Sequence, residues 1–338
     1  MRKAGLGTWA PRLVEMARPC ILLVPGSVEE AANAPLGASR LGGEPDMPPD
    51  LDWPHRPALK PGWDHDRIPG VSLGRYHWLH RLFRTERWQH AEKLKQALEQ
   101  REDPAEREMR NRDWPLSFIA QIDFAELRAV HALDGFPAAG RLLLFCDPFE
   151  LPWGHRDDQP LARALFTEQP AEALERRRSP AEFDAPAARE VMPNGYVFKP
   201  RILRPTAWLL PPPENSRELY GLRAEADDAW ARGEPASSAY RQFWRDLFAA
   251  HPDTFGEEGH MIHQVGGIAF SIQNPVEEAR YADDPRDRAD NWQLVLQIGS
   301  DSKAGMMWGD VGRLYLCARK RDLIARRFDQ CWIDMQCY

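Results

Sequence analysis

The runs Phe118-Ile-Ala-Gln-Ile-Asp123 and Leu294-Val-Leu-Gln-Ile-Gly299 decide the fold, because one such run occurs in each half of the chain. Each is a short apolar segment that ends in Gln-Ile, and each stops at a residue typical of turns. This composition predicts a buried β-strand in both places. A pattern that occurs once in each half indicates an internal duplication.

Two further landmarks occur in the same order around these strands. A diglycine comes before each strand, and a Gly-Arg-Leu strand start comes after it. The pairs are Arg40-Leu-Gly-Gly43 with Gln264-Val-Gly-Gly267, and Gly140-Arg-Leu-Leu-Leu-Phe-Cys146 with Gly312-Arg-Leu-Tyr-Leu-Cys317. The spacing differs between the halves because the first half contains a Pro-rich and helical insertion at approximately 54–113.

These landmarks predict an α+β fold with a β-rich core built from two diverged, pseudo-twofold-related copies and with helical insertions. The copies cover approximately 20–150 and 196–338. One copy alone would have an incomplete core, whereas two copies can bury their apolar sheet faces against each other. We therefore expect residues 1–338 to form a single domain.

Helices and further strands are expected outside the landmarks. The clearest helix is predicted at 238–250, where aromatic and apolar side chains recur at helical spacing on one face. Strands are predicted at 269–273 and 330–337, and alternate residues of the latter share one face. Within a helical region at 74–112, Asp103-Pro-Ala-Glu106 has the features of a capped helix start.

The composition limits the classes of partner. A net charge of −7 argues against general nucleic-acid binding, because neutralising phosphates requires a basic surface. The same charge suits a basic protein partner. No stretch approaches the roughly 20 apolar residues of a membrane helix, and we expect a cytoplasmic protein with no membrane partner. The five cysteines include no C-x-x-C pair, which predicts small buried side chains rather than disulfides or a zinc ribbon.

The landmarks and their neighbours resemble the YwqG-like family, a bacterial family of uncharacterised domains. The resemblance covers most of the chain, except the regions 54–113 and 150–240. It is carried by Ser39-Arg-Leu-Gly-Gly-Glu-Pro45, Trp53-Pro54, Pro115-Leu-Ser-Phe-Ile-Ala-Gln-Ile122, Gly140-Arg-Leu142, Leu296-Gln-Ile-Gly-Ser-Asp301, Met306-Met-Trp-Gly-Asp310, Gly312-Arg-Leu-Tyr315 and Gln336-Cys-Tyr338. It implies a pseudo-symmetric α+β fold without an established reaction. Some members are encoded near toxins and look like immunity proteins, which implies a protein-binding role.

The loop Gly305-Met-Met-Trp-Gly309 is flanked by Asp301 and Asp310. Two carboxylates beside an exposed Trp308 would bind a cation, a sugar or a basic side chain. In the alternative interpretation, Trp308 fills the core and the aspartates cap turns through their side chains.

The matching region of the first copy would complete a site between the two Gln-Ile strands. A ligand would then lie in a cleft that both copies line, across the pseudo-twofold axis. The candidate binding residues are Trp53, Gln121, Asp123, His263, Gln297, Asp301, Trp308 and Asp310.

Two motifs suggest chemistry that their surroundings do not favour. In Glu257-Glu-Gly-His-Met-Ile-His263, two histidines lie three residues apart near carboxylates, as metal ligands can. The following diglycine favours a turn with structural histidines, so we predict no metal site. Gly70-Val-Ser-Leu-Gly74 matches a nucleophile elbow but lacks the preceding buried strand, so we predict no catalytic serine.

The sequence therefore predicts a cytoplasmic, non-enzymatic protein-binding protein without a cofactor. Its specific form would be an immunity protein that neutralises a bacterial toxin. The alternative is a small-molecule-binding enzyme or sensor that uses the acidic and aromatic cleft between the repeats, with His263 as acid–base.

Overall fold

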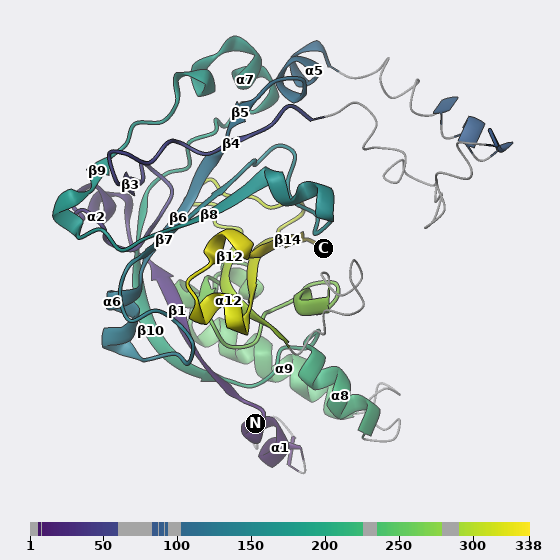
Figure 1. Cartoon of the computed structure of the whole chain (residues 1–338). Coiled ribbons are helices and arrows are strands. Elements are labelled where there is room, and N and C mark those ends of the chain that lie inside the picture. Colours follow the sequence, from purple (N-terminus) through teal and green to yellow (C-terminus); the bar gives the residue numbers. More distant parts are fainter. Residues whose placement is uncertain are drawn as a thin grey trace. The chain divides into compact units, whose positions relative to one another are not determined.

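The described part of the chain forms two compact units (Figure 1). The computed structural model describes residues 6–7, 9–59, 83–86, 88–90, 92–93, 103–225, 235–278 and 291–338. The first unit comprises Met1–Asp52, Leu116–Ser179 and Val197–Tyr338, and the second comprises Trp53–Pro115 and Pro180–Tyr196. The predicted insertion at 54–113 thus falls in the second unit. The motif at 70–74 and most of the predicted helical region at 74–112 lie outside the described residues.

An antiparallel sheet, ten-stranded within the described residues, forms the body of the first unit. Together with the helices that surround it, this sheet confirms the predicted α+β class. In spatial order its strands are β14 (Trp332–Gln336), β13 (Arg313–Arg319), β12 (Trp292–Gly299), β11 (Gln264–Val265), β1 (Arg18–Pro25), β10 (Arg201–Leu210), β2 (Arg40–Leu41), β6 (Ser117–Asp123), β7 (Arg141–Cys146) and β8 (Ala162–Thr167).

The sheet is nearly closed, and the side chain of Gln159 connects the segment before one edge strand to the other edge strand. Gln159 lies in the 3₁₀ helix η3 (Arg156–Leu161), directly before β8. Its Nε2 donates to the carbonyl of Ile333 in β14, and its Oε1 accepts from the Ile333 N–H, both at 3.2 Å. The amide thus occupies backbone groups that an open edge would offer to another chain.

The strands on the two sides of the central β1–β10 pair follow matching orders. Outward from β1 come the diglycine strand β11, the Gln-Ile strand β12, the Gly-Arg-Leu strand β13 and finally β14. Outward from β10 come β2, β6, β7 and β8, which carry the corresponding landmarks. Both Gln-Ile strands also break register at the same point of the pattern, at 118–120 in β6 and at 294–296 in β12.

The two faces of the sheet belong to different apolar clusters. Ile21 and Leu23 of β1 join the largest cluster, together with Ile333 and Met335 of β14, which confirms the predicted alternation in that last strand. Cys20 and Leu22 alternate with them and face a second cluster. Helix α9 (Pro235–Ala250) supplies its buried Tyr240 and Trp244 to that second cluster, which confirms the predicted aromatic face.

The predicted strand at 269–273 is not a strand in the structure. Its backbone N–H groups bond to glutamine side chains instead of to a neighbouring strand. The N–H of Phe270 donates to Gln297 Oε1 at 2.9 Å, and the two N–H groups of residues 272–273 donate to Gln336 Oε1 at 3.0 Å. The segment is buried like a strand, but its backbone N–H groups bond to side-chain oxygens instead of to the carbonyls of a neighbouring strand.

The second unit contains a short β-ladder and helices. Strands β4 (His55–Arg56) and β5 (Trp114–Pro115) pair, and α5 (Pro104–Arg110) packs against α7 (Pro186–Val191). The fully buried Arg56 guanidinium donates to three backbone carbonyls, so its N–H donors are not left unpaired by burial. The predicted cap of α5 is confirmed, because the side chain of Asp103 accepts from the N–H of Ala105.

The remaining elements are short, apart from α8. None of the described helices is long and apolar enough to cross a membrane. The elements are α1 (Ala10–Glu15), α2 (Val28–Ala32), α6 (Phe124–Val130), α8 (Arg217–Glu225), α10 (Pro252–Phe255) and α12 (Lys320–Ile324), the 3₁₀ helices η4 (Ala171–Ala173), η5 (Ala181–Asp184), η6 (Glu257–Gly259) and η8 (Phe328–Gln330), and the paired strands β3 (Asp46–Met47) and β9 (Glu175–Arg176).

Candidate functional site

The predicted binding residues do not gather around one described cavity. Trp53 belongs to the second unit, and the others belong to the first. In the first unit all of them are buried except Asp310, which is exposed. The structure places them in four groups, built around the glutamines, Asp123, His263 and Trp308.

Gln121 and Gln297 hold the chain on both sides of the diglycine strands. Gln121 accepts from the N–H of Asp46 at 2.9 Å and donates to the carbonyl of Ala38 at 3.0 Å. Gln297 accepts from the N–H of Phe270 at 2.9 Å and donates to the carbonyl of Ile262 at 3.1 Å. Both amides are fully buried, so their hydrogen-bonding capacity is used within the protein.

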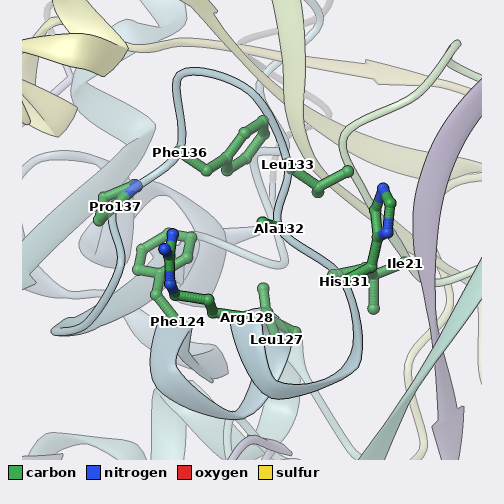
Figure 2. A pocket seen from close by; sticks show the side chains of 9 residues that line it. All are labelled: Ile21, Phe124, Leu127, Arg128, His131, Ala132, Leu133, Phe136 and Pro137. Carbon is green, nitrogen blue, oxygen red and sulfur yellow. The ribbon is translucent and has the colours of Figure 1, made fainter.

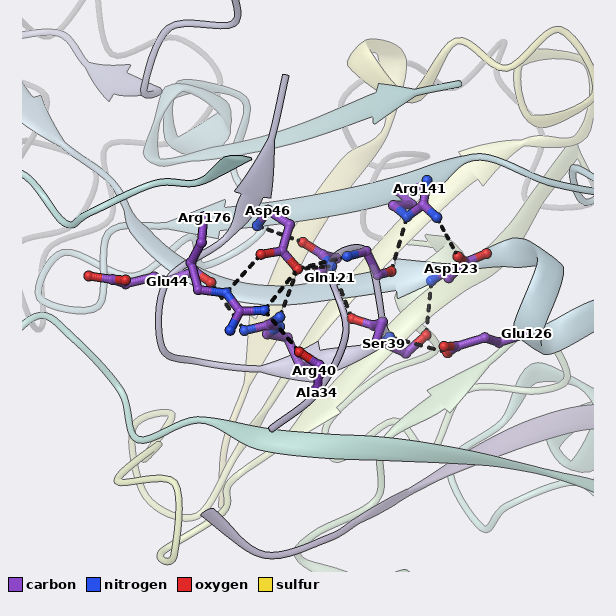
Figure 3. Close-up of polar contacts among 12 residues, drawn as sticks. Ala34, Ser39, Arg40, Glu44, Asp46, Gln121, Asp123, Glu126, Arg141 and Arg176 are labelled. Carbon is purple, nitrogen blue, oxygen red and sulfur yellow. Dashed lines mark hydrogen bonds and ion pairs between the residues drawn. The ribbon is translucent and has the colours of Figure 1, made fainter. Parts of the chain in front are cut away.

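A charged cluster surrounds Gln121 in the first half (Figure 3). The buried Asp46 carboxylate receives Arg40 at 2.7 Å, Arg176 at 2.9 Å and the N–H of Gly37 at 2.8 Å. Burial would raise the pKa of Asp46, but the hydrogen bond from Arg176 and the charge of Arg40 lower it overall. Arg176 is partly exposed, and it is the member of this cluster that solvent reaches.

Asp123 caps the helix that follows its strand. One carboxylate oxygen accepts from the N–H of Ala125 at 2.8 Å, at the start of α6. The other accepts from Arg141 at 2.9 Å. In addition, the N–H of Asp123 donates to the hydroxyl of Ser39. These bonds fix the direction in which α6 leaves the sheet.

His263 and Asp301 are the two predicted residues that the structure brings together. Their Nε2 and Oδ2 atoms lie 3.8 Å apart, and Arg201 donates to the same carboxylate oxygen. Neither ring nitrogen of the fully buried His263 has a hydrogen-bond partner. Burial lowers the pKa of His263, and nearby Arg201 lowers it further, against the opposing effect of Asp301. The imidazole is therefore neutral near pH 7.

Trp308 fills the core, as one of the two interpretations of its loop predicted. Its side chain is fully buried, it donates to the carbonyl of Gly299 at 3.2 Å, and it meets Phe198 edge-on. Asp301 caps the turn through the N–H groups of residues 303–304. Asp310 is exposed, and its backbone carbonyl accepts from the N–H of Tyr338. The loop therefore does not present an exposed tryptophan between two carboxylates.

The described residues offer little nucleophilic or metal-binding chemistry. Burial raises the pKa of Cys20 to about 12 and the pKa of Cys146 and Cys317 well above the usual range, so these thiols stay protonated. Among the described side chains, no group of three or more His, Cys, Asp or Glu residues is placed to hold a metal ion.

A small hollow with a mixed polar and apolar lining opens between α6 and the loop that follows it (Figure 2). Leu127 of α6 and Leu133 and Phe136 of the loop line it, with the buried Ile21 of β1 also contributing. The exposed Arg128 and His131 also line the hollow, where both supply hydrogen-bond donors and Arg128 adds positive charge. The hollow is shallow, with room for about one water molecule, so a partner's side chain would cover its mouth rather than fill it.

An exposed isoleucine lies next to this loop. The Cγ1 atom of Ile324 in α12 is 3.7 Å from the position that a Cβ on Gly135 would occupy. Ile324 is 69% exposed, which is unusual for its type and leaves a large apolar side chain in solvent. Beneath the surface, Phe328 stacks on Phe124 at 5.8 Å, so the two segments share one core. We call α6, residues 131–137 and residues 320–327 the α6–α12 face.

Sequence reasoning missed this face, because packing decides which side of the five-residue helix α12 faces the core. Asp322 and Leu323 are adjacent and both buried, whereas the next residue, Ile324, is exposed. Exposed basic residues flank these residues, at 320–321 and 326–327.

Comparison with known proteins gives a family and no activity. A search of curated proteins finds no match to the chain. The model of a domain of unknown function, DUF1963, matches residues 39–337, which include every strand of the large sheet except β1. Because this match extends over most of the chain, the protein belongs to the DUF1963 family.

Proposed function

We propose that this protein is a non-enzymatic protein-binding protein that docks its partner on the α6–α12 face. The observation that carries the proposal is the exposed Ile324, which lies next to the loop that lines the small hollow of the first unit. Binding energy at protein interfaces concentrates in a few apolar anchors, and Ile324 offers such an anchor on this surface.

The polar groups of the first unit support a binding role over a catalytic one. Gln121 and Gln297 use their amides on backbone groups, Asp123 and Asp301 cap turns or helices, and Trp308 is buried. A catalytic group has to reach its substrate directly or through one water molecule. These side chains serve the fold instead.

The specific form of the proposal is a cytoplasmic immunity protein that neutralises a bacterial toxin. It rests on the resemblance to YwqG-like proteins, and DUF1963 membership is compatible with it. A toxin bound at the α6–α12 face would be held by Ile324. Co-expression with each toxin candidate from neighbouring genes tests this form: wild type should restore growth, and Ile324→Asp should not. If neither protein restores growth against any candidate, the immunity role is wrong.

The docking proposal has its own test, which does not require a toxin. A photo-reactive amino acid replaces Ile324 in the full chain, which is co-expressed with the products of neighbouring genes. The matched control places the same group at Leu209 of β10, another exposed apolar residue, at 63% exposure. We expect a single cross-linked partner from position 324 and none from position 209. Equal cross-linking from both positions, or from neither, contradicts the proposal.

We also propose that the two halves of the sheet descend from one duplicated unit. The matching strand orders, the shared register break and the equivalent bonds of Gln121 and Gln297 support it. Under this proposal, the region at 54–113 is an insertion in the first copy, and residues 1–338 make one family domain. The charged Asp46 cluster is then a feature of the first copy. In the second copy it is Phe270 that donates its N–H to the glutamine, as Asp46 does in the first.

The small-molecule alternative retains one supporting observation, at His263. Its two ring nitrogens have no hydrogen-bond partner, and the carboxylate of Asp301 lies 3.8 Å away, so a small movement would bring the two groups within hydrogen-bond reach. A ligand would have to reach a fully buried ring. A thermal-shift screen of polar metabolites tests this idea. A ligand that stabilises wild type and not His263→Leu supports it, and a screen without such a ligand rejects it.

A further inference from the structure

The α6–α12 face carries charge of the opposite sign to the chain as a whole. The chain has a net charge of −7, yet Arg128 of α6 and Lys320 and Arg321 of α12 are exposed on this face. His131 adds a further nitrogen donor beside Arg128 at the hollow. Local charge, rather than net charge, decides which partner a surface attracts.

The carboxylates nearest to α12 are already paired. Buried Asp322 accepts from Arg327, and it also lies 3.5 Å from Arg319. Glu168 of the neighbouring chain segment pairs with Arg326. Asp134 is the exposed carboxylate of the loop 131–137. Arg321 also lies 3.8 Å from Asp322, so three arginines share this one buried carboxylate. The face therefore keeps a surplus of positive charge, to which the exposed Lys320 adds.

We propose that the partner segment which docks on this face is acidic, with one aromatic or branched aliphatic side chain flanked by carboxylates. This inference rests on the proposed function and adds the chemistry of the partner. The apolar side chain packs across the mouth of the hollow, which Leu127, Leu133 and Phe136 line, and its neighbours cover Ile324. The carboxylates pair with Arg128 on one side and with Lys320 and Arg321 on the other.

The apolar and charged parts of the face have separate roles. The hollow and Ile324 lose water when a partner binds, and so supply most of the affinity. The exposed basic side chains contribute less affinity, because solvent screens them, but they attract acidic segments and repel basic ones. A simple polyanion has no side chain for the hollow, which distinguishes a docking peptide from nucleic acid.

Selection from a display library of random dodecapeptides against the full chain tests the proposal. We expect the enriched peptides to carry Asp or Glu around a single Phe, Trp, Leu or Ile. A labelled peptide from this set should bind the variant with Lys320→Glu and Arg321→Glu about tenfold more weakly than wild type. Raising the salt concentration from about 50 to 300 mM should weaken wild-type binding several-fold.

Matched controls separate charge from folding. The variant with Arg241→Glu and Arg245→Glu makes the same charge change on exposed positions of α9, and it should bind within about twofold of wild type. All variants should melt with wild-type cooperativity, because the changed side chains are exposed. A peptide whose carboxylates are replaced by lysines should recover binding to the Lys320→Glu and Arg321→Glu variant.

Two outcomes overturn the inference in distinguishable ways. If the enriched peptides are basic or neutral and still lose binding on Ile324→Asp, the face docks a partner and the proposed acidic chemistry is wrong. If no enriched peptide is sensitive to Ile324→Asp, both the inference and the proposed docking function fail. A single-stranded oligonucleotide that binds as tightly as the peptides, and equally well to Ile324→Asp, likewise overturns the inference.

Discussion

Gln121 and Gln297 make equivalent pairs of hydrogen bonds in the two halves of the sheet. Each side-chain oxygen accepts from the N–H of the segment after a diglycine, and each side-chain nitrogen donates to the carbonyl of the segment before it. Every distance lies between 2.9 and 3.1 Å. A buried amide used in this way binds two chain segments to one strand and satisfies one backbone N–H and one backbone carbonyl there.

The first prediction is that Gln121→Ala and Gln297→Ala each lower the free energy of unfolding by about 2–4 kcal/mol, because two buried backbone groups lose their partners. The losses should agree within about 1 kcal/mol, with Gln121→Ala the larger, since Gln121 also donates to Asp46 at 3.2 Å. Urea unfolding followed by tryptophan fluorescence measures both. Gln242→Ala, on the exposed side of α9, is the control and should change little. A negligible loss for one variant contradicts equivalent roles.

The second prediction concerns the buried pair of Arg40 and Asp46. Asp46→Asn leaves the guanidinium of Arg40, which is 2% exposed, without a counter-charge, and should destabilise the protein by about 3–5 kcal/mol. The exposed pair of Arg189 and Asp184 is the control, and Asp184→Asn should cost less than about 1 kcal/mol. Chemical unfolding at pH 7 measures the contrast. Similar losses in both variants would show that the buried pair contributes no more than a surface pair.

Much of the sheet could be predicted because its signals are local. The Gln-Ile strands, the Gly-Arg-Leu strands and α9 are set by short apolar patterns, and each forms where its pattern lies. The run at 269–273 has the same apolar character, but its donors bond to glutamines far away in sequence, so its pattern cannot separate it from a strand.

The candidate site was less predictable, because it depends on contacts between distant residues. Asp46 lies 75 residues from Gln121 and 130 residues from Arg176, so no local sequence pattern predicts that these residues form a cluster. The burial of Trp308 depends on Phe198 in a different segment. The exposure of Ile324 likewise depends on tertiary packing, because Asp322 and Leu323 directly before it are both buried.

The third prediction is that Asp334→Asn stabilises the protein at alkaline pH. Burial raises the pKa of Asp334 to about 7, and nearby Asp158 adds to this, although a hydrogen bond from Gln336 opposes it. The chain passes close to the carboxylate at Gly154, where a Cβ would lie 2.3 Å from Oδ1 of Asp334, and the positive φ of Gly154 suits glycine.

The direction of this pH effect follows from the difference between the pKa of Asp334 in the folded and unfolded states. Its pKa is about 3.9 in an unfolded chain, so the stabilising effect of the protonated form is complete below that pH and is lost as pH rises towards 7. Asparagine cannot ionise, so the variant should exceed wild type by roughly 2–4 kcal/mol at pH 8 and by much less at pH 5. Asp329→Asn, at an exposed position, is the control. If the free energies of unfolding of wild type and Asp334→Asn differ by the same amount at both pH values, the pKa of Asp334 is not raised by burial.

The fourth prediction is that the imidazole of His263 acts as a neutral filler. Its ring is fully buried and its nitrogens have no partners, so His263→Leu, of similar volume, should change the free energy of unfolding by less than about 1.5 kcal/mol at pH 8. Burial and Arg201 lower the pKa of the ring in the folded state. The stabilising effect of the neutral ring is therefore complete above the unfolded pKa of about 6.5 and is lost as pH falls below it.

Wild type should thus lose stability relative to His263→Leu between pH 7 and pH 5, and urea midpoints across this range measure the loss. His260→Leu, three residues away and partly exposed, is the matched control, and its pH profile should follow that of wild type. If His263→Leu instead loses several kcal/mol at pH 8, the ring forms a direct bond to Asp301 in solution, because removing a satisfied buried donor costs more than exchanging one apolar side chain for another. That result would favour the acid–base alternative for this pair over the role of filler.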